Sequence, residues 1–269
     1  MGQTIRTTKL LLDLGKRDEG GANTDKRAAL TATIEVLNAA RAFYIDFFLA
    51  HADKLAERVP YSSEKHLEMR ERAISANELL SWAETCTVET RDHPQPWEGW
   101  NFSARFADMP FIYRRSVIKD AIGKARSFLS QRANWQQLGK KKGRPGVPGA
   151  NDHPTLYKGT CSLQLENSNQ HARFVQLKVY DGKAWVWLNY PVRCSRYFQQ
   201  RQQEKPWEQK SPILVLRARS AELHFPQIKE VEARRVKESK LDPDLVTVGV
   251  DLNVKQLAVI TVRQRGQII

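Results

Sequence analysis

The sequence predicts an α+β protein in which helices are inserted after the first strand of a β-barrel. The opening stretch "TIRTTKLLLDL", residues 4–14, is typical of a strand. Apolar residues then recur at helical spacing between about residues 23 and 135, and the period changes to two from Cys161 onward. This order of a strand, helices and a strand-rich segment indicates that the first strand joins a sheet completed after the helices.

Three helical stretches are expected between the first strand and the strand-rich part. The first begins at a cap on Asn23 or Thr24 and continues to about Leu55. The second is predicted over Ser62 to Glu84, and the third over Phe111 to Trp135. One stripe of the third helix is apolar and is predicted to be buried: Phe111, Ile118, Ile122, Ala125 and Leu129.

A basic surface is predicted along the third helix and in the loop that follows it. Three of its cations lie within roughly 40° of one another on the flank of the apolar stripe: Arg115, Lys119 and Arg126. The loop "GKKKGRPGVPGANDHP" is rich in Gly and Pro and cannot continue the helix. The candidate phosphate-binding residues are Arg114, Arg115, Lys119, Lys124, Arg126, Lys140, Lys141, Lys142 and Arg144. The alternative interpretation is that the lysines are a solvated loop surface.

Aromatic residues that could stack on nucleic-acid bases are less clearly marked. Tyr157 beside Lys158, just after the basic loop, is the preferred candidate for stacking. Trp185 and Trp187 share one face of a strand, where packing is the favoured interpretation. Asp181-Gly182 predicts the hairpin turn that precedes this strand. A charged linker, "EARRVKESKLDPD", then separates the strand-rich part from a closing pair of strands.

The charge of the chain favours a polyanionic partner. The formal net charge is +13 and the pI is about 9.7, and no membrane-spanning run accompanies them, so nucleic acid is the expected partner and a membrane surface the weaker one. The cysteines are three, far apart and without a C-x-x-C pair. They predict free thiols in a reducing cytoplasm and no zinc ribbon.

The segment "VTVGVDLNVKQLAVITV" contains an aspartate in an otherwise apolar strand. Burial of Asp251 is costly unless hydrogen bonds or a metal ion compensate its charge. Mg²⁺ is the natural partner because it prefers carboxylate, water and phosphate oxygens. The alternative is that Asp251 caps a turn after the strand.

The pattern G-V-D-x-N-x-x-x-L-A-V-I at 249–260 resembles the first RuvC motif of the TnpB transposon-encoded nucleases and the type V CRISPR effectors. The resemblance implies that Asp251 is the first catalytic carboxylate and a Mg²⁺ ligand. Asn253 stands where the family usually has Gly, and Asn also tolerates a left-handed turn. Three weaker similarities accompany the motif: "IEVLNAARAFYIDFFLAH", "LGKKKGRPGVP" and "LHFPQIKEV".

The resemblance implies a domain order for the whole chain. Residues 1–22 would be the first strand of an oligonucleotide-binding wedge barrel, 23–145 a helical recognition domain and 146–244 the rest of the wedge. Residues 245–269 would begin an RNase H-like RuvC domain that is incomplete here. We therefore expect the guide-RNA-binding front portion of an RNA-guided DNA endonuclease, inactive by itself.

The partners implied by the resemblance are a structured guide RNA and target DNA, together with a second copy or a C-terminal half of the protein. Mg²⁺ would act in the complete RuvC site. The alternatives are a nuclease-dead RNA-guided DNA-binding protein or accessory subunit, and a plain RNA-binding protein. No paired spacing of the histidines predicts a further metal site.

Overall fold

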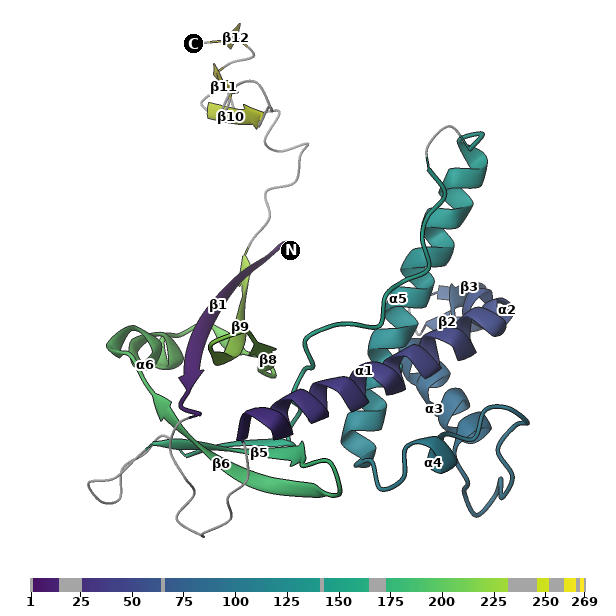
Figure 1. Ribbon diagram of the computed structural model, residues 1–269. Helices are drawn as coiled ribbons and strands as arrows, with labels where there is room; N and C mark the ends of the chain where they lie inside the picture. Colours follow the sequence, from purple (N-terminus) through teal and green to yellow (C-terminus); the bar gives the residue numbers. More distant parts are fainter. Residues whose placement is uncertain are drawn as a thin grey trace.

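The computed structural model describes residues 2–14, 26–63, 66–140, 143–164, 173–231, 246–251, 259–264 and 267–268. It is α+β, as predicted (Figure 1). The helices are α1 (Lys26–Ala50), α2 (Ala52–Ala56), α3 (Ala76–Thr87), α4 (Phe102–Arg105), α5 (Phe111–Gln137) and α6 (Arg196–Gln203). The strands are β1 (Gly2–Leu12), β2 (Arg58–Ser63), β3 (His66–Ala73), β4 (Cys161–Gln164), β5 (Phe174–Tyr180), β6 (Trp185–Arg193), β7 (Glu208–Gln209), β8 (Ile213–Leu216), β9 (Ala221–Val231), β10 (Val246–Asp251), β11 (Val259–Gln264) and β12 (Gln267–Ile268).

The first strand belongs to a sheet whose other strands all follow the helices. β1 pairs antiparallel with β9 along its whole length, from Gly2 opposite Val231 to Leu12 opposite Ala221. At its other edge β1 pairs with β6 at Leu11 and Leu12. The strand order is β4-β5-β6-β1-β9-β7, with β8 also on β9. The helices from α1 to α5 are therefore inserted between two neighbouring strands of one sheet.

The sheet curls into an antiparallel half-barrel with an apolar interior. Alternate residues of β5 are buried, as the period of two requires, and the interior includes Leu10, Tyr190 and Phe225. The curl continues beyond β8, because Leu156 N–H donates to the Pro212 carbonyl over 2.7 Å just before β4 begins. α6 covers the interior from one side and places Phe198 5.4 Å from the Phe225 ring.

α1 and α5 pack against each other beside the half-barrel (Figure 1). Their buried faces are apolar, and an aromatic cluster around Phe43, Phe47 and Trp100 joins α1 to the segment that contains α4. The predicted stripe of α5 is confirmed at Ile118, Ile122 and Ala125 and wrong at its first position, because Phe111 is 58% exposed. The structure also contains the helices predicted at each end of the helical region.

The helix predicted over Ser62 to Glu84 is wrong in its first part. β2 and β3 form an antiparallel hairpin there, from Arg58 opposite Ala73 inward, and α3 begins at Ala76. The local helix propensity of "EKHLEMRERA" is high, but the strand pairing overrides it. The start of α3 is fixed by a capping box, in which the Ser75 hydroxyl accepts from Glu78 N–H and the Glu78 carboxylate accepts from Ser75 N–H.

The strand pair predicted near residue 250 is confirmed. β10 and β11 are antiparallel, with Val246 opposite Gln264 and Asp251 opposite Val259, and β12 pairs with β11. The residues between β10 and β11, 252–258, lie outside the described residues. Among the described residues, no helix combines the length and apolar character needed to cross a membrane.

Candidate nucleic-acid interface

The cations predicted along α5 lie on that helix, and most of those in its first half have acidic or carbonyl partners. Arg114 and Arg115 both contact Glu84 of α3, each with a nitrogen–oxygen distance of 3.1 Å. The Arg126 guanidinium donates to the Ile74 carbonyl. Because these partners are in α3 and at Ile74, two residues before its start, the basic flank of α5 faces α3. These arginines hold the two elements together.

Lys119 of α5 is exposed, as Arg115 is. It lies one turn after Arg115, and the two line a small polar depression of about 270 Å³ with Asn77 and Ser81 of α3. Arg115 is itself about half exposed. This pair is therefore the part of the predicted flank that remains accessible to a phosphate group.

The last third of α5 extends past the other helices, and the chain then returns beside it (Figure 1). Residues 130–140 are exposed except for the half-buried Trp135, and the described residues that follow, 143–150, are exposed or half-buried. We call residues 130–150 the arm. Its cations are Arg132, Lys140, Lys141, Lys142 and Arg144, five in all, and it contains no acidic residue. Lys141 and Lys142 lie outside the described residues.

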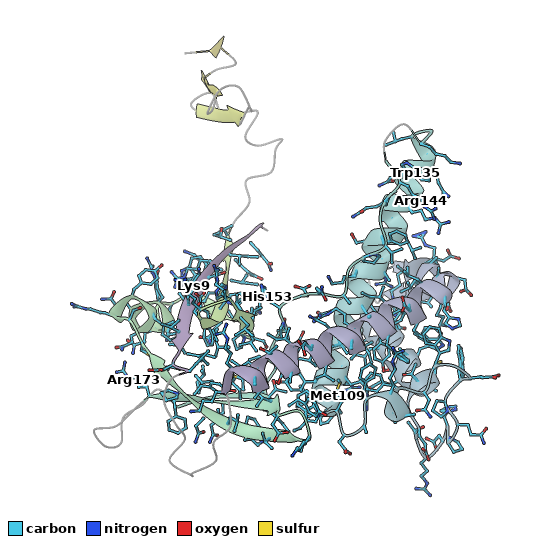
Figure 2. All side chains as sticks on the ribbon, in the orientation of Figure 1. Lys9, Met109, Trp135, Arg144, His153 and Arg173 are labelled. Carbon is cyan, nitrogen blue, oxygen red and sulfur yellow. The ribbon has the colours of Figure 1, made fainter. Side chains whose placement is uncertain are left out.

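The tip of the arm is a defined turn. α5 ends where Gly139 and Lys140 take positive φ values of 66° and 61°. Gly139 N–H donates to the Gln136 carbonyl and Lys140 N–H to the Trp135 carbonyl, which satisfies helix carbonyls that would otherwise lack partners. The Lys140 ammonium lies 5.7 Å from the Trp135 ring centroid. Figure 2 shows Trp135 and Arg144 near this free end of α5.

The base of the arm is anchored by a buried arginine of α1. The Arg41 side chain is fully buried and donates to the Ala150 carbonyl over 2.8 Å and to Asp120 of α5 over 3.1 Å. Burial raises the pKa of Asp120, while the Arg41 guanidinium opposes that shift. Lys124 adds contacts to Asp152 at 3.2 Å and to the Gly149 carbonyl at 3.1 Å. The returning chain is thereby fixed to α1 and α5.

The two residues predicted after the basic loop have different surroundings. Lys158 is exposed. Tyr157 is half-buried, its pKa is raised by burial and by Asp120, and its carbonyl accepts from Thr160. Only part of the Tyr157 ring is therefore available for stacking on a base, whereas Lys158 is available for contact with a phosphate.

Asp251 is the last residue of β10, opposite Val259, and its side chain lies outside the part of the chain that the structure describes. Across the described residues, no group of three or more His, Cys, Asp or Glu side chains is placed to hold a metal ion. A single carboxylate does not fit a two-metal site, so no catalytic step follows from the described residues alone.

The sequence alone did not reveal the acidic residues that form ion pairs with the predicted cations. Glu84 and Asp152 lie outside α5, and nothing in the spacing along α5 indicates them. One signal was available for the start of α3: the pattern S-A-N-E at 75–78 is a capping box, and it marks the end of the preceding element.

Two comparisons with known proteins place the chain in a family. The model of the Aq_aa04 family matches residues 20–181, a span that includes α1, α5 and the whole arm. A relative from Aquifex aeolicus (strain VF5), "Uncharacterized protein aq_aa04", is 31% identical over 166 residues, which are 60% of this chain and 90% of the relative. The match covers more than half of the chain, and the chain belongs to the Aq_aa04 family.

Proposed function

We propose that this chain binds a structured guide RNA as the N-terminal portion of an RNA-guided DNA endonuclease. The observation that carries the RNA-binding part is the arm: its sequence has five cations and no acid, and its described cations Arg132, Lys140 and Arg144 are exposed. Nucleic acid presents closely spaced phosphates, and Lys or Arg side chains that neutralise them provide affinity without reading sequence. The arm supplies such charges along the end of α5 and along the chain that returns beside it.

The arm is anchored at its base, so its described cations are held in position. This supports recognition of an RNA of defined shape over nonspecific attraction of RNA by charge. Arg41 and Lys124 fix the residues near 150, and α5 itself fixes the other side of the arm. A positioned row of cations can match the backbone spacing of an A-form helix, which proteins recognise mainly by shape. In this proposal the half-barrel is the wedge barrel, and the helices between β1 and β4 are the recognition domain.

The nuclease part of the proposal depends on the resemblance of residues 249–260 to the first RuvC motif. Asp251, at the end of β10, would be the first carboxylate of a Mg²⁺ site. Such a site polarises a phosphate oxygen and activates a water molecule when its ions are bound. Further carboxylates are required, so Asp251 is assigned as one ligand and no step is derived from it.

The alternative is RNA-guided DNA binding without cleavage. A chain of this kind would occupy DNA or serve as an accessory subunit. In the complete protein that this proposal requires, Asp251→Ala separates the two, because it abolishes cleavage of a guide-matched DNA by the endonuclease and leaves guide-dependent DNA binding unchanged in both.

The RNA-binding proposal is tested by purifying the protein from cells that carry its native locus and sequencing the RNA that stays bound. The arm variant is Arg132→Gln with Lys140→Gln and Arg144→Gln. A matched control removes the same charge from exposed cations elsewhere: Arg91→Gln with Lys205→Gln and Arg219→Gln. We expect one abundant structured RNA with the wild type and the control, and loss of that RNA with the arm variant.

Salt dependence gives the second measurement. If the three arm cations each contact a phosphate, the slope of log affinity against log salt becomes shallower by about 2 in the arm variant. The control variant retains the wild-type slope. Heterogeneous RNA that both variants lose equally would contradict the proposal, since it would mean that net charge alone attracts RNA.

A further inference from the structure

The outer face of the β5–β6 hairpin carries an exposed tryptophan beside a lysine. Val175, Leu177 and Val179 of β5 point into the half-barrel, so the alternate residue Lys178 lies on the opposite face. Lys178 is directly opposite Trp187 in the register. The Lys178 ammonium lies 6.0 Å from the Trp187 ring centroid, and Trp187 is 46% exposed.

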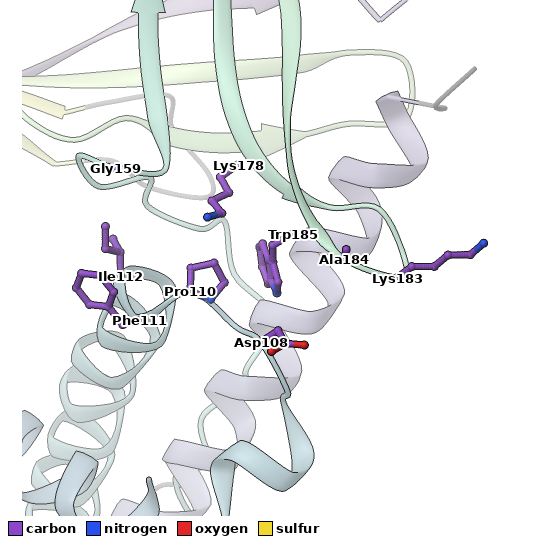
Figure 3. A pocket seen from close by; sticks show the side chains of 9 residues that line it. All are labelled: Asp108, Pro110, Phe111, Ile112, Gly159, Lys178, Lys183, Ala184 and Trp185. Carbon is purple, nitrogen blue, oxygen red and sulfur yellow. The ribbon is translucent and has the colours of Figure 1, made fainter. Parts of the chain in front are cut away.

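A cavity of about 580 Å³ lies between the hairpin and the start of α5, and Lys178 of this pair is part of its lining. Figure 3 shows Lys178 and Trp185 on the hairpin side and Pro110, Phe111 and Ile112 on the α5 side. Its lining consists of Asp108, Pro110, Phe111, Ile112, Gly159, Lys178, Lys183, Ala184 and Trp185. The volume lies within the range of small-ligand sites in proteins.

The walls of the cavity are held in place by packing. The Trp185 ring lies 5.0 Å from Tyr113 of α5 and 5.5 Å from Tyr180, and the Tyr113 hydroxyl donates to the Lys178 carbonyl over 2.6 Å. Gly159 has a φ of 96°, and a Cβ there would lie 2.5 Å from Ile112 Cδ1. The hairpin, the loop before β4 and α5 are therefore locked together around the cavity.

The charges around the cavity favour an anion. Lys178 and Lys183 line it, and Asp108 is the acid in the same lining. The neighbouring Asp181 carboxylate accepts from the backbone N–H groups of Lys183 and Ala184, both at 2.8 Å, so it is occupied within the hairpin turn. An aromatic ring at 46% exposure with the Lys178 ammonium beside it matches the two parts of a nucleotide, its base and its phosphate.

We propose that Trp187, Lys178 and this cavity bind an unpaired nucleotide of RNA. The base stacks on the Trp187 ring, and Lys178 and Lys183 contact the flanking phosphates. The inference rests on the proposed function and adds to it that the bound RNA includes an unpaired segment, recognised at a place other than the arm.

The test measures the affinity for a short fluorescein-labelled oligouridine and for a labelled RNA duplex by fluorescence anisotropy. Trp187→Ala weakens binding of the single strand about 5- to 160-fold, because one stacked base contributes about 1–3 kcal/mol, and it leaves duplex binding unchanged. Trp187→Phe keeps most of the affinity. Trp97→Ala is the matched control, since Trp97 is 45% exposed on the loop after α3.

Each outcome decides the inference. Single-strand binding by Trp187→Ala at the wild-type affinity overturns it, as does an equal loss for single strand and duplex, which would indicate phosphate contact without stacking. If the arm variant loses RNA while Trp187→Ala does not, the proposed function stands and this inference falls. If the wild type binds no RNA, both fall. Loss of self-association in Trp187→Ala with unchanged RNA affinity would assign the face to contact between copies instead.

Discussion

The two parts of α5 carry the same kinds of cation in different surroundings. In the first part, Arg114 and Arg126 contact Glu84 and the Ile74 carbonyl, so their charges are used inside the protein, whereas Arg115 contacts Glu84 and stays about half exposed. In the arm, five cations lie within residues 130–150 without an acidic residue in the same stretch. The density of cations along a helix therefore does not show whether they are structural or available to bind phosphate. Contacts with residues from other elements decide it.

The largest expected effect is on the free energy of unfolding, at the contacts that fix the base of the arm to α1 and α5. Arg41→Met removes the buried guanidinium that ties Asp120 to the Ala150 carbonyl. Removal of one member of a buried ion pair leaves the other without its partner, so we expect the free energy of unfolding to fall by about 3 kcal/mol or more. Urea denaturation followed by circular dichroism measures it. An unchanged midpoint would show that the base of the arm is held by other contacts.

The next effect concerns the paired cations of the first part. Glu84→Gln removes the charge that Arg114 and Arg115 share, and we expect a loss of about 1–2 kcal/mol in the free energy of unfolding. Glu89→Gln is the matched control, because it removes the same charge from an exposed position close in sequence. If the two variants have equal stability, the contacts of Glu84 are too exposed to matter and the two parts of α5 differ less than proposed.

A smaller effect is expected at the capping box that sets the start of α3. Ser75→Ala removes the hydroxyl that accepts from Glu78 N–H and should lower the free energy of unfolding by about 1 kcal/mol.

Glu78 adds a pH dependence to the stability, because hydrogen bonds from Arg72 and then Ser75 lower its pKa from 4.5 to about 2. The stabilisation by its charged form is present above pH 4.5 and is lost as the pH falls toward 2. Thermal melts of the wild type and Glu78→Gln should therefore converge on acidification, and a constant difference would contradict this assignment.

Much of the fold could be predicted from periodicity, and the error at Ser62 to Glu84 has a physical cause. The long stripes of α1 and α5 and the Asp181-Gly182 turn are strong local signals, and the structure contains each of them. In residues 66–73 local propensity favours a helix, but pairing with β2 depends on residues that one window of sequence does not include. The S-A-N-E pattern at 75–78 is the sequence signal that places the start of the helix at Ala76 and not at Ser62.

The candidate sites were less predictable because they depend on contacts between elements. The partners of Arg114 and Lys124 lie 30 and 28 residues away in sequence, at Glu84 and Asp152. Trp187 could have been found: the inward set of β5 and the hairpin register together place Trp187 opposite Lys178 on the outer face. The period of two does predict that Trp185 and Trp187 share this face, but it favours packing as their role. The arm was indicated directly by its composition, since no acid interrupts its cations.

The smallest expected change in stability is in the arm itself. Arg132→Gln with Lys140→Gln and Arg144→Gln alters exposed side chains, so the free energy of unfolding should change by less than about 0.5 kcal/mol while RNA affinity falls. Arg114→Gln with Arg126→Gln is the contrasting variant: it should destabilise the protein through lost contacts with Glu84 and the Ile74 carbonyl, and it should affect RNA less. Urea denaturation and RNA titration of the same preparations measure both quantities. If the arm variant were the less stable one, its cations would be structural and the distinction between the two parts of α5 would fail.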